Sequence, residues 1–264
     1  MRTPKVRIPY KYGETIKIKP VFDVHLGSKA CDKKAFKEFL EDSDENTYFL
    51  FGGDTFDSIV VNDVRYRKSG DDTRGDAIVD ELVDMGVEYL EPYKDRILGM
   101  GKGNHEDVVT RRCGTDLIAR LCRRLGVRDL GYSGLLRIQL HENNSRIRKV
   151  IIRYHHGWGG GSRTQGADLT KFSKDISYWE ADIFLYGHVH RKQTDTIPRL
   201  GLSGDKLISK PKILGICGTF LRTYTNSVQP TYSEVKGYPP VEIGGIVVTI
   251  KPRREWVKIK ARLD

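Results

Sequence analysis

Five short blocks rich in Asp, Asn, His and Gly lie between residues 23 and 190 of the 264-residue chain. They are Asp23-Val24-His25, Gly52-Gly53-Asp54, Gly103-Asn104-His105-Glu106, His155-His156-Gly157 and Gly187-His188-Val189-His190. Each block ends a stretch that is typical of a β-strand, and Gly-rich or polar residues follow it. Six of the seven histidines lie in the blocks. Packing alone does not account for that placement, so the blocks predict a metal site.

The types of donor in the blocks limit the choice of metal. Imidazole, carboxylate and amide ligands without a thiolate suit Mn²⁺, Fe, Zn²⁺ or Ni²⁺ better than Ca²⁺. Two ions about 3.5–4 Å apart need a bridging carboxylate and separate ligands for each ion. Asp54, which follows two glycines, is the natural bridge. We expect two divalent metal ions, with Mn²⁺ as the first choice and Fe, Zn²⁺ or Ni²⁺ as alternatives.

The composition is that of a globular chain. Of 264 residues, 38% are hydrophobic and 30% are charged, which excludes a disordered polymer. No apolar run approaches the ~18 residues that span a bilayer. The basic N-terminus lacks the apolar segment of a signal peptide, so we expect a cytoplasmic protein without membrane contact. The four cysteines form no close pair, which gives no support to a Cys-based zinc site.

The charge balance is strongly basic. The formal net charge is +10 and the isoelectric point is near 9.3. A surplus of Lys and Arg attracts polyanions. The excess is spread over separate clusters, of which Arg111-Arg112, Arg123-Arg124 and Arg253-Arg254 are examples. Together with the metal chemistry this favours a nucleic acid or nucleotide substrate, and the alternative is an ordinary solvated surface.

The blocks need a scaffold of strands that ends where they begin. Hydrophobic patterning predicts strands at residues 14–22, 47–51, 96–100, 136–140, 150–154, 182–186, 212–217, 246–250 and 256–259. Helical spacing predicts helices at residues 33–40, 76–95, 115–125 and 169–179. Residues 58–75 are expected to form a loop with helical pieces, and Asn143-Asn144 a hairpin turn. Strands mixed with helices and hairpins imply a two-sheet sandwich covered by helices.

In their order and content, the blocks are similar to those of the calcineurin-like metallophosphoesterase superfamily. The matching motifs run from Asp23 to His190, about two-thirds of the chain. The resemblance implies a single domain over residues 1–264 of the α/β class. It further implies a four-layer α/β/β/α sandwich, in which two mixed β-sheets are flanked by helices, with a dinuclear site on loops at the strand ends.

The resemblance also implies how the ligands divide between the two metals. Asp23, His25 and His190 would hold one metal, and Asp54 would bridge. Asn104 would hold the second metal, together with His188 and one of the two adjacent histidines discussed next.

Two histidines compete for one ligand position. The family motif has a His either directly before Gly or one residue earlier, so both His155 and His156 qualify. We favour His156, because His-Gly is the commoner form. Successive side chains of a strand point to opposite faces, so one of the pair is expected to be a ligand. His155 stays open as the alternative.

The implied reaction is in-line attack of a metal-bridging hydroxide on phosphorus, without a covalent enzyme intermediate. His105 would bind no metal; it would stabilise charge on the phosphoryl group or protonate the leaving oxygen. Asn104 and Asp54 complete the expected catalytic set. Lys102, Arg111 and Arg112 are candidates for substrate phosphate, with a solvated basic face as the alternative.

The motifs can be compared with those of different branches of the superfamily to predict the substrate class. The block from Gly53 to Asp57 resembles the repair-exonuclease branch and lacks the Asp-Arg-Gly continuation of the Ser/Thr protein phosphatases. Glu106 matches those phosphatases, but Lys102 stands where they have Arg. The basic balance favours a phosphodiesterase or nuclease. A phosphomonoesterase acting on phosphoprotein or nucleotide is the alternative, and a non-catalytic nucleic-acid-binding module is the remote one.

Overall fold

The computed structural model describes residues 1–58, 78–142, 146–226, 230–253 and 257–264. Most of the loop predicted for residues 58–75 and the Asn143-Asn144 turn therefore lie outside the described residues. Twelve of the strands form two six-stranded sheets.

The first sheet has the strand order β1-β6-β7-β8-β12-β9. Its strands are β1 (Lys5–Pro9), β6 (Ser133–Glu142), β7 (Arg146–His155), β8 (Ile183–Tyr186), β12 (Lys212–Cys217) and β9 (Lys192–Ile197). Strand β8 pairs in parallel with both β7 and β12, whereas β6 pairs with β7 in antiparallel fashion. The sheet is therefore mixed.

The second sheet has the order β14-β13-β2-β3-β4-β5. Its strands are β14 (Val257–Leu263), β13 (Ile246–Pro252), β2 (Ile16–Val21), β3 (Thr47–Gly52), β4 (Ile97–Gly101) and β5 (Asp129–Gly131). Strands β2 to β5 are parallel, so their carboxyl ends meet at one edge, and β13 is antiparallel to β2. Three of the metal-ligand blocks follow β2, β3 and β4.

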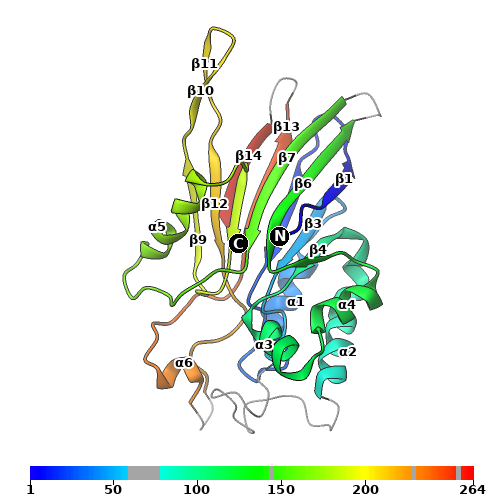
Figure 1. Cartoon of the computed structure of the whole chain (residues 1–264), viewed down its shortest axis with the longest axis vertical. Coiled ribbons are helices and arrows are strands. Elements are labelled where there is room, and N and C mark those ends of the chain that lie inside the picture. Colours follow the sequence, from blue (N-terminus) through cyan, green and yellow to red (C-terminus); the bar gives the residue numbers. More distant parts are fainter. Residues whose placement is uncertain (59–77, 143–145, 227–229, 254–256) are drawn as a thin grey trace.

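Helices cover the outer face of each sheet (Figure 1). The second sheet is covered by α1 (Lys33–Glu41), α2 (Ile78–Leu90) and α4 (Leu117–Leu125), and the first by α5 (Ala167–Ser173) with the 3₁₀ turn η2 (Lys174–Ser177). The remaining elements are η1 (Glu91–Arg96), α3 (Asn104–Cys113), α6 (Tyr232–Val235) and a projecting ribbon of β10 (Leu200–Ser203) and β11 (Lys206–Ser209).

Three hydrophobic layers separate these four layers of structure. Strand β3 shows why, because its successive side chains point to opposite faces. Phe49 and Phe51 pack outward under α1, whereas Leu50 packs between the two sheets with residues such as Ile138. A third cluster, which includes Phe172, joins α5 to the first sheet. The predicted four-layer α/β/β/α sandwich is confirmed.

The predicted elements match the structure best where a strand or helix is strongly patterned. The predicted strand at 212–217 coincides with β12, and the helix at 76–95 is an α-helix to Leu90 that continues as η1, where Pro92 lies in the first turn. The sequence reading missed helix α3 and the short or polar strands β1, β5 and β9. No helix within the described ranges is both long and apolar enough to cross a bilayer.

Candidate metal centre

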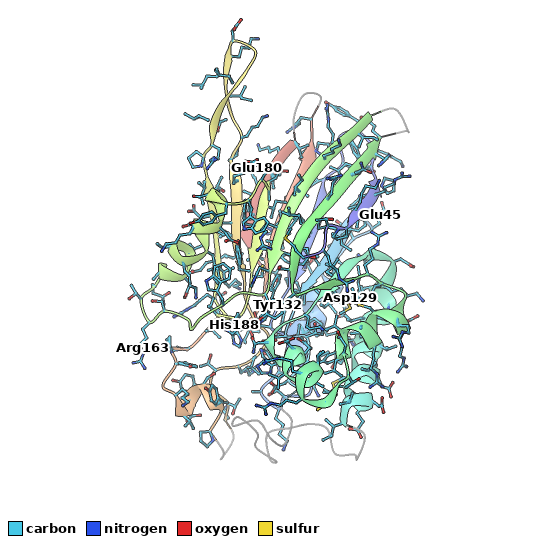
Figure 2. All side chains as sticks on the ribbon, in the orientation of Figure 1. Glu45, Asp129, Tyr132, Arg163, Glu180 and His188 are labelled. Atoms are coloured by element: carbon cyan, nitrogen blue, oxygen red, sulfur yellow. The ribbon has the colours of Figure 1, made fainter. Side chains whose placement is uncertain are left out.

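The five blocks come together where strands of both sheets end. Asp23 and His25 follow β2, Asp54 follows β3, and Asn104 follows β4. The first sheet contributes the blocks after β7 and β8. A hydrogen bond links the loops of the two sheets directly, since the backbone N–H of His188 donates to Asp23 Oδ2 over 2.7 Å. Figure 2 shows His188 near the middle of the molecule, at the lower ends of the central strands.

The local backbone of the blocks is unusual. Left-handed φ angles occur in five residues other than Gly within the described parts of the chain, and all five are block residues: Asp23, His25, Asp54, His188 and His190. Their φ angles lie between 51° and 71°. This conformation costs roughly 1–2 kcal/mol for a residue with a side chain. Five such residues at one place indicate that the fold holds these side chains against a local preference, which is typical of functional sites.

A first group of donors is formed by Asp23, His25 and His190, whose ligand atoms lie within 4.8 Å of one another. Nε2 of His25 is 3.3 Å from Nε2 of His190. Asp23 Oδ1 lies 3.5 Å from His190 Nε2 and 3.9 Å from His25 Nε2. All three donors therefore face one small volume.

A second group is formed by Asp54, His156 and His188, again within 4.8 Å. His156 Nε2 lies 3.1 Å from Asp54 Oδ2. The side-chain oxygen of Asn104 joins them, at 3.0 Å from His156 Nε2 and 2.8 Å from His188 Nδ1. The two groups adjoin, because Asp23 Oδ1 is 3.9 Å from His156 Nε2.

The donors fit divalent cations. Asp23 is fully buried, and its Oδ1 has no hydrogen-bond partner within the described part of the chain. A buried carboxylate oxygen without a partner is costly, and a cation would offset that cost. The facing Nε2 atoms of His25 and His190 are each able to ligate when unprotonated. We therefore conclude that these clustered His and Asp groups can hold metal ions.

The histidines of the site stabilise the ionised form of its carboxylates even without a cation. Burial would raise the pKa of Asp23, but His190 and then His156 bring the pKa of that carboxyl below its ordinary value. Asp54 is also buried, and His156 and His105 hold its pKa well below the usual range. Burial would lower the pKa of His156, yet the Asp54 carboxylate raises it to about 9. Both carboxylates are therefore kept in the form that binds metal.

Asp57 is a member of the site that the sequence reading did not assign. Its Oδ1 lies 2.9 Å from Nδ1 of His105 and 3.4 Å from Nδ1 of His25. The two imidazoles are in edge contact, with ring centroids 4.6 Å apart. Nε2 of His105 lies 3.9 Å from Asp54 Oδ2. Asp57 thus lies beside the Nδ1 atoms of two imidazoles whose Nε2 atoms face the donors. The sequence feature that could have indicated this role is the position of Asp57 three residues after Asp54, in the same block.

Glu106 is the second unassigned member. It is fully buried, and its carboxylate accepts hydrogen bonds from the N–H groups of Gly103, Asp54 and Phe56 at 2.9–3.1 Å. Burial, followed by the charge of Asp54, raises the pKa of Glu106 to about 7. Glu106 joins the loop after β3 to the loop after β4, and so fixes the backbone that carries Asp54.

The two adjacent histidines lie in different surroundings. His156 is fully buried in the second donor group. His155 is instead packed against the rings of Tyr132 and Trp158, and its Nδ1 accepts the N–H of Gly157 over 2.9 Å. Burial lowers the pKa of His155 to about 4. The structure brings His156 to the other donors and turns His155 away, as the sequence reading favoured; which of them ligates remains a prediction.

The three predicted phosphate contacts lie outside both donor groups. Lys102 directs its ammonium to the carboxylate of Asp116, which balances its charge. Arg111 and Arg112 lie in the last turn of α3, whereas Asn104 begins that helix, and Arg111 Nε is 2.9 Å from Asp107. Their role in substrate binding remains a prediction.

Comparisons with known proteins yielded structural likenesses only. No protein-family model matches the chain, and no curated protein does. Vacuolar Protein Sorting 29 from Cryptosporidium parvum is 14% identical, with 94% of this chain and 97% of that chain covered and a TM-score of 0.37. A predicted phosphoesterase from Streptococcus pneumoniae is 14% identical, with 95% and 90% covered and a TM-score of 0.35. A 5'-nucleotidase precursor from Thermus thermophilus is 11% identical, with 95% and 54% covered and a TM-score of 0.44.

The resemblance to a known family rests on the two sheets and on the donors that meet at their strand ends. Donor atoms from all five blocks lie close together at the strand ends. In fold and in its ordered set of donor residues, this chain resembles the calcineurin-like metallophosphoesterase superfamily.

Proposed function

We propose that the protein is a phosphodiesterase or nuclease that depends on two divalent metal ions. The observation that carries the proposal is the pair of adjoining donor groups. Oδ1 of buried Asp23 lies between His190 and His156 and has no hydrogen-bond partner among the described residues. Asp23, His25 and His190 would hold one ion. Asn104, His156 and His188 would hold the second, with His155 as the alternative to His156, and Asp54 would bridge. Mn²⁺ is the proposed metal.

The bound ions would supply Lewis-acid charge for the phosphoryl group and a water activated for attack. The protein groups around them have separate tasks. His105 presents Nε2 toward the donors, and the Asp57 carboxylate lies 2.9 Å from its Nδ1. In the imidazolium form, which that carboxylate stabilises, Nε2 can donate a hydrogen bond to a phosphoryl oxygen or a proton to the leaving oxygen. In that form both ring nitrogens carry a proton, and the Asp57 carboxylate orients the ring.

The start of helix α3 also favours a phosphate in this site. The helix begins at Asn104 and runs for ten residues, so its positive end faces the donors. The N–H of His105 donates to Asp54 Oδ1 over 2.9 Å. The positive end of the helix therefore stabilises both the bridging carboxylate and an incoming anion.

The choice of a diester in nucleic acid rests on charge. The chain has 45 Lys and Arg against 35 Asp and Glu, and a basic surface concentrates polyanions. Glu106, the residue that resembled the phosphatases, is buried scaffold with three backbone partners, so it does not favour a monoester.

The test is hydrolysis of bis-p-nitrophenyl phosphate against p-nitrophenyl phosphate, with added Mn²⁺ and with a chelator. We expect the protein to hydrolyse the diester faster than the monoester, and the chelator to abolish this activity. Asp54→Asn is the control and should be inactive. A monoester preference would move the proposal to a phosphatase. An inactive protein that purifies without stoichiometric Mn, Fe or Zn would instead support a binding module.

A further inference from the structure

A cluster of cations lies on the outer face of the β13–β14 ribbon, away from the metal centre. A hollow of about 240 Å³ there is lined by Thr249, Lys251, Arg253, Lys258 and Lys260. Four of these five side chains are cationic and none is acidic. We call these five residues the basic ribbon.

The alternation of the two strands creates this face. Val248 and Ile250 of β13 are buried between the sheets, so Thr249 and Lys251 point outward. In β14, Val257 and Ile259 pack on the same inner core, which leaves Lys258 and Lys260 outward. The cations are thus gathered by strand geometry on one surface.

The pairing of the strands places like charges together. Lys251 lies directly opposite Lys258, and Thr249 lies opposite Lys260. Like charges directly opposite each other on one face of an antiparallel pair are destabilising, because their Cβ atoms are only about 5 Å apart. A fold that keeps such a pair accepts a cost that a bound anion would offset.

These cations also lack the compensation that other lysines have. Within the parts of the chain that the structure describes, Lys251, Lys258 and Lys260 form no ion pair. On α1, in contrast, Lys34 and Lys37 lie 3.8 Å and 3.7 Å from Glu38 and Glu41. Lysines on an edge strand hinder its pairing with the edge of another chain. That purpose does not require two lysines opposite each other without counter-charges. The basic ribbon is therefore suited to an anionic ligand.

We propose that the basic ribbon binds the sugar–phosphate backbone of a nucleic acid, at a surface separate from the catalytic centre. The choice of polymer rests on the proposed function. Among the described residues, the lining has no large exposed apolar side chain, whereas binding to a membrane surface usually adds such side chains. Strand β13 is antiparallel to β2, so its end at Pro252 lies about 20 Å from its end at Ile246 near the site. A small diester in the site does not touch the ribbon.

The test compares two variants with the same change in net charge. Lys251→Gln/Lys258→Gln removes the opposed pair, and Lys34→Gln/Lys37→Gln is the matched control on α1. Affinity for labelled single- and double-stranded oligonucleotides is measured by fluorescence anisotropy over a range of salt, with a chelator present to prevent cleavage. Circular dichroism checks that each protein stays folded under these conditions.

We expect the ribbon variant to bind about 10-fold more weakly at low salt. The slope of log K against log salt should shrink by about 1 to 2, since each phosphate contact contributes about 0.7 to 0.9. The control should match the wild type. Hydrolysis of bis-p-nitrophenyl phosphate should be unchanged in both, and the melting temperature of the ribbon variant should hold or rise because repulsion is removed.

Equal affinities and equal slopes in both variants would overturn the proposal. So would weakened binding to anionic vesicles with binding to oligonucleotides intact. If the wild type hydrolyses no diester but its binding still depends on Lys251 and Lys258, the proposed function fails while the basic ribbon stands. If it hydrolyses diesters and the ribbon variant binds normally, only this inference fails.

Discussion

Asp57 Oδ1 lies 2.9 Å from Nδ1 of His105, and the same oxygen lies 3.4 Å from Nδ1 of His25. One carboxylate thereby orients a proposed metal ligand and the proposed acid. We expect Asp57→Asn to lower kcat for a diester by about 10- to 100-fold, because both imidazoles lose their charged partner. Bound metal, measured by mass spectrometry, should fall less than activity. Unchanged kcat would show that Asp57 does not position His105.

The adjacent histidines offer a matched pair of variants. His156→Ala removes a buried donor that lies 3.1 Å from Asp54 and 3.0 Å from Asn104, so metal content and activity should both be lost. His155→Ala removes a ring that packs on Tyr132 and Trp158, and metal content should be retained. Metal stoichiometry of the purified proteins decides the matter; equal content in wild type and His156→Ala would remove His156 from the ligand set.

Gly103 is required by the position of Asp54. A Cβ at residue 103 would lie 2.1 Å from Asp54 Oδ1 and 2.5 Å from Asp54 N. We expect Gly103→Ala to destabilise the fold by about 1–3 kcal/mol and to abolish activity, because Asp54 must move. Gly160→Ala is the control, since a Cβ there meets nothing within 4 Å. Urea unfolding curves that coincide for the two variants would contradict this account.

Removal of metal should weaken the fold. Asp23 and Asp54 are buried carboxylates in neighbouring donor groups, so each bound ion offsets their desolvation. At a free Mn²⁺ concentration 100 times the dissociation constant, one site adds about 2.7 kcal/mol to the free energy of unfolding. Thermal unfolding should therefore shift upward with Mn²⁺ and downward with chelator. An Asp54→Asn protein should respond less, and an equal response would place the ions elsewhere.

The sequence was sufficient to predict that the five blocks gather at the strand ends and that the fold has four layers, because both depend on local pattern. Each donor follows an apolar strand, and parallel strands bring their carboxyl ends together, so convergence of Asp23 with Asp54 was foreseeable. The four layers follow from the same strands and from amphipathic helices such as α4.

Helix α3 was missed although its end signals are present. Gly103 occupies the N-cap position, the Glu106 carboxylate three residues later accepts the Gly103 N–H, and Gly114 ends the helix with a φ of 67°. Its residues are mostly polar, so hydrophobic spacing gave no indication. The roles of Asp57 and Glu106 depend on contacts between loops of different strands, which no local pattern contains.

The direct hydrogen bond from His188 to Asp23 has a consequence for how the two sheets separate during unfolding. Asp23 lies in the loop after β2 of the second sheet, whereas His156, His188 and His190 lie in loops next to strands of the first. Ions bound by these donors together would connect the two sheets of the sandwich. Separation of the halves would then release the ions, and the rate of metal exchange would report how often the two sheets part.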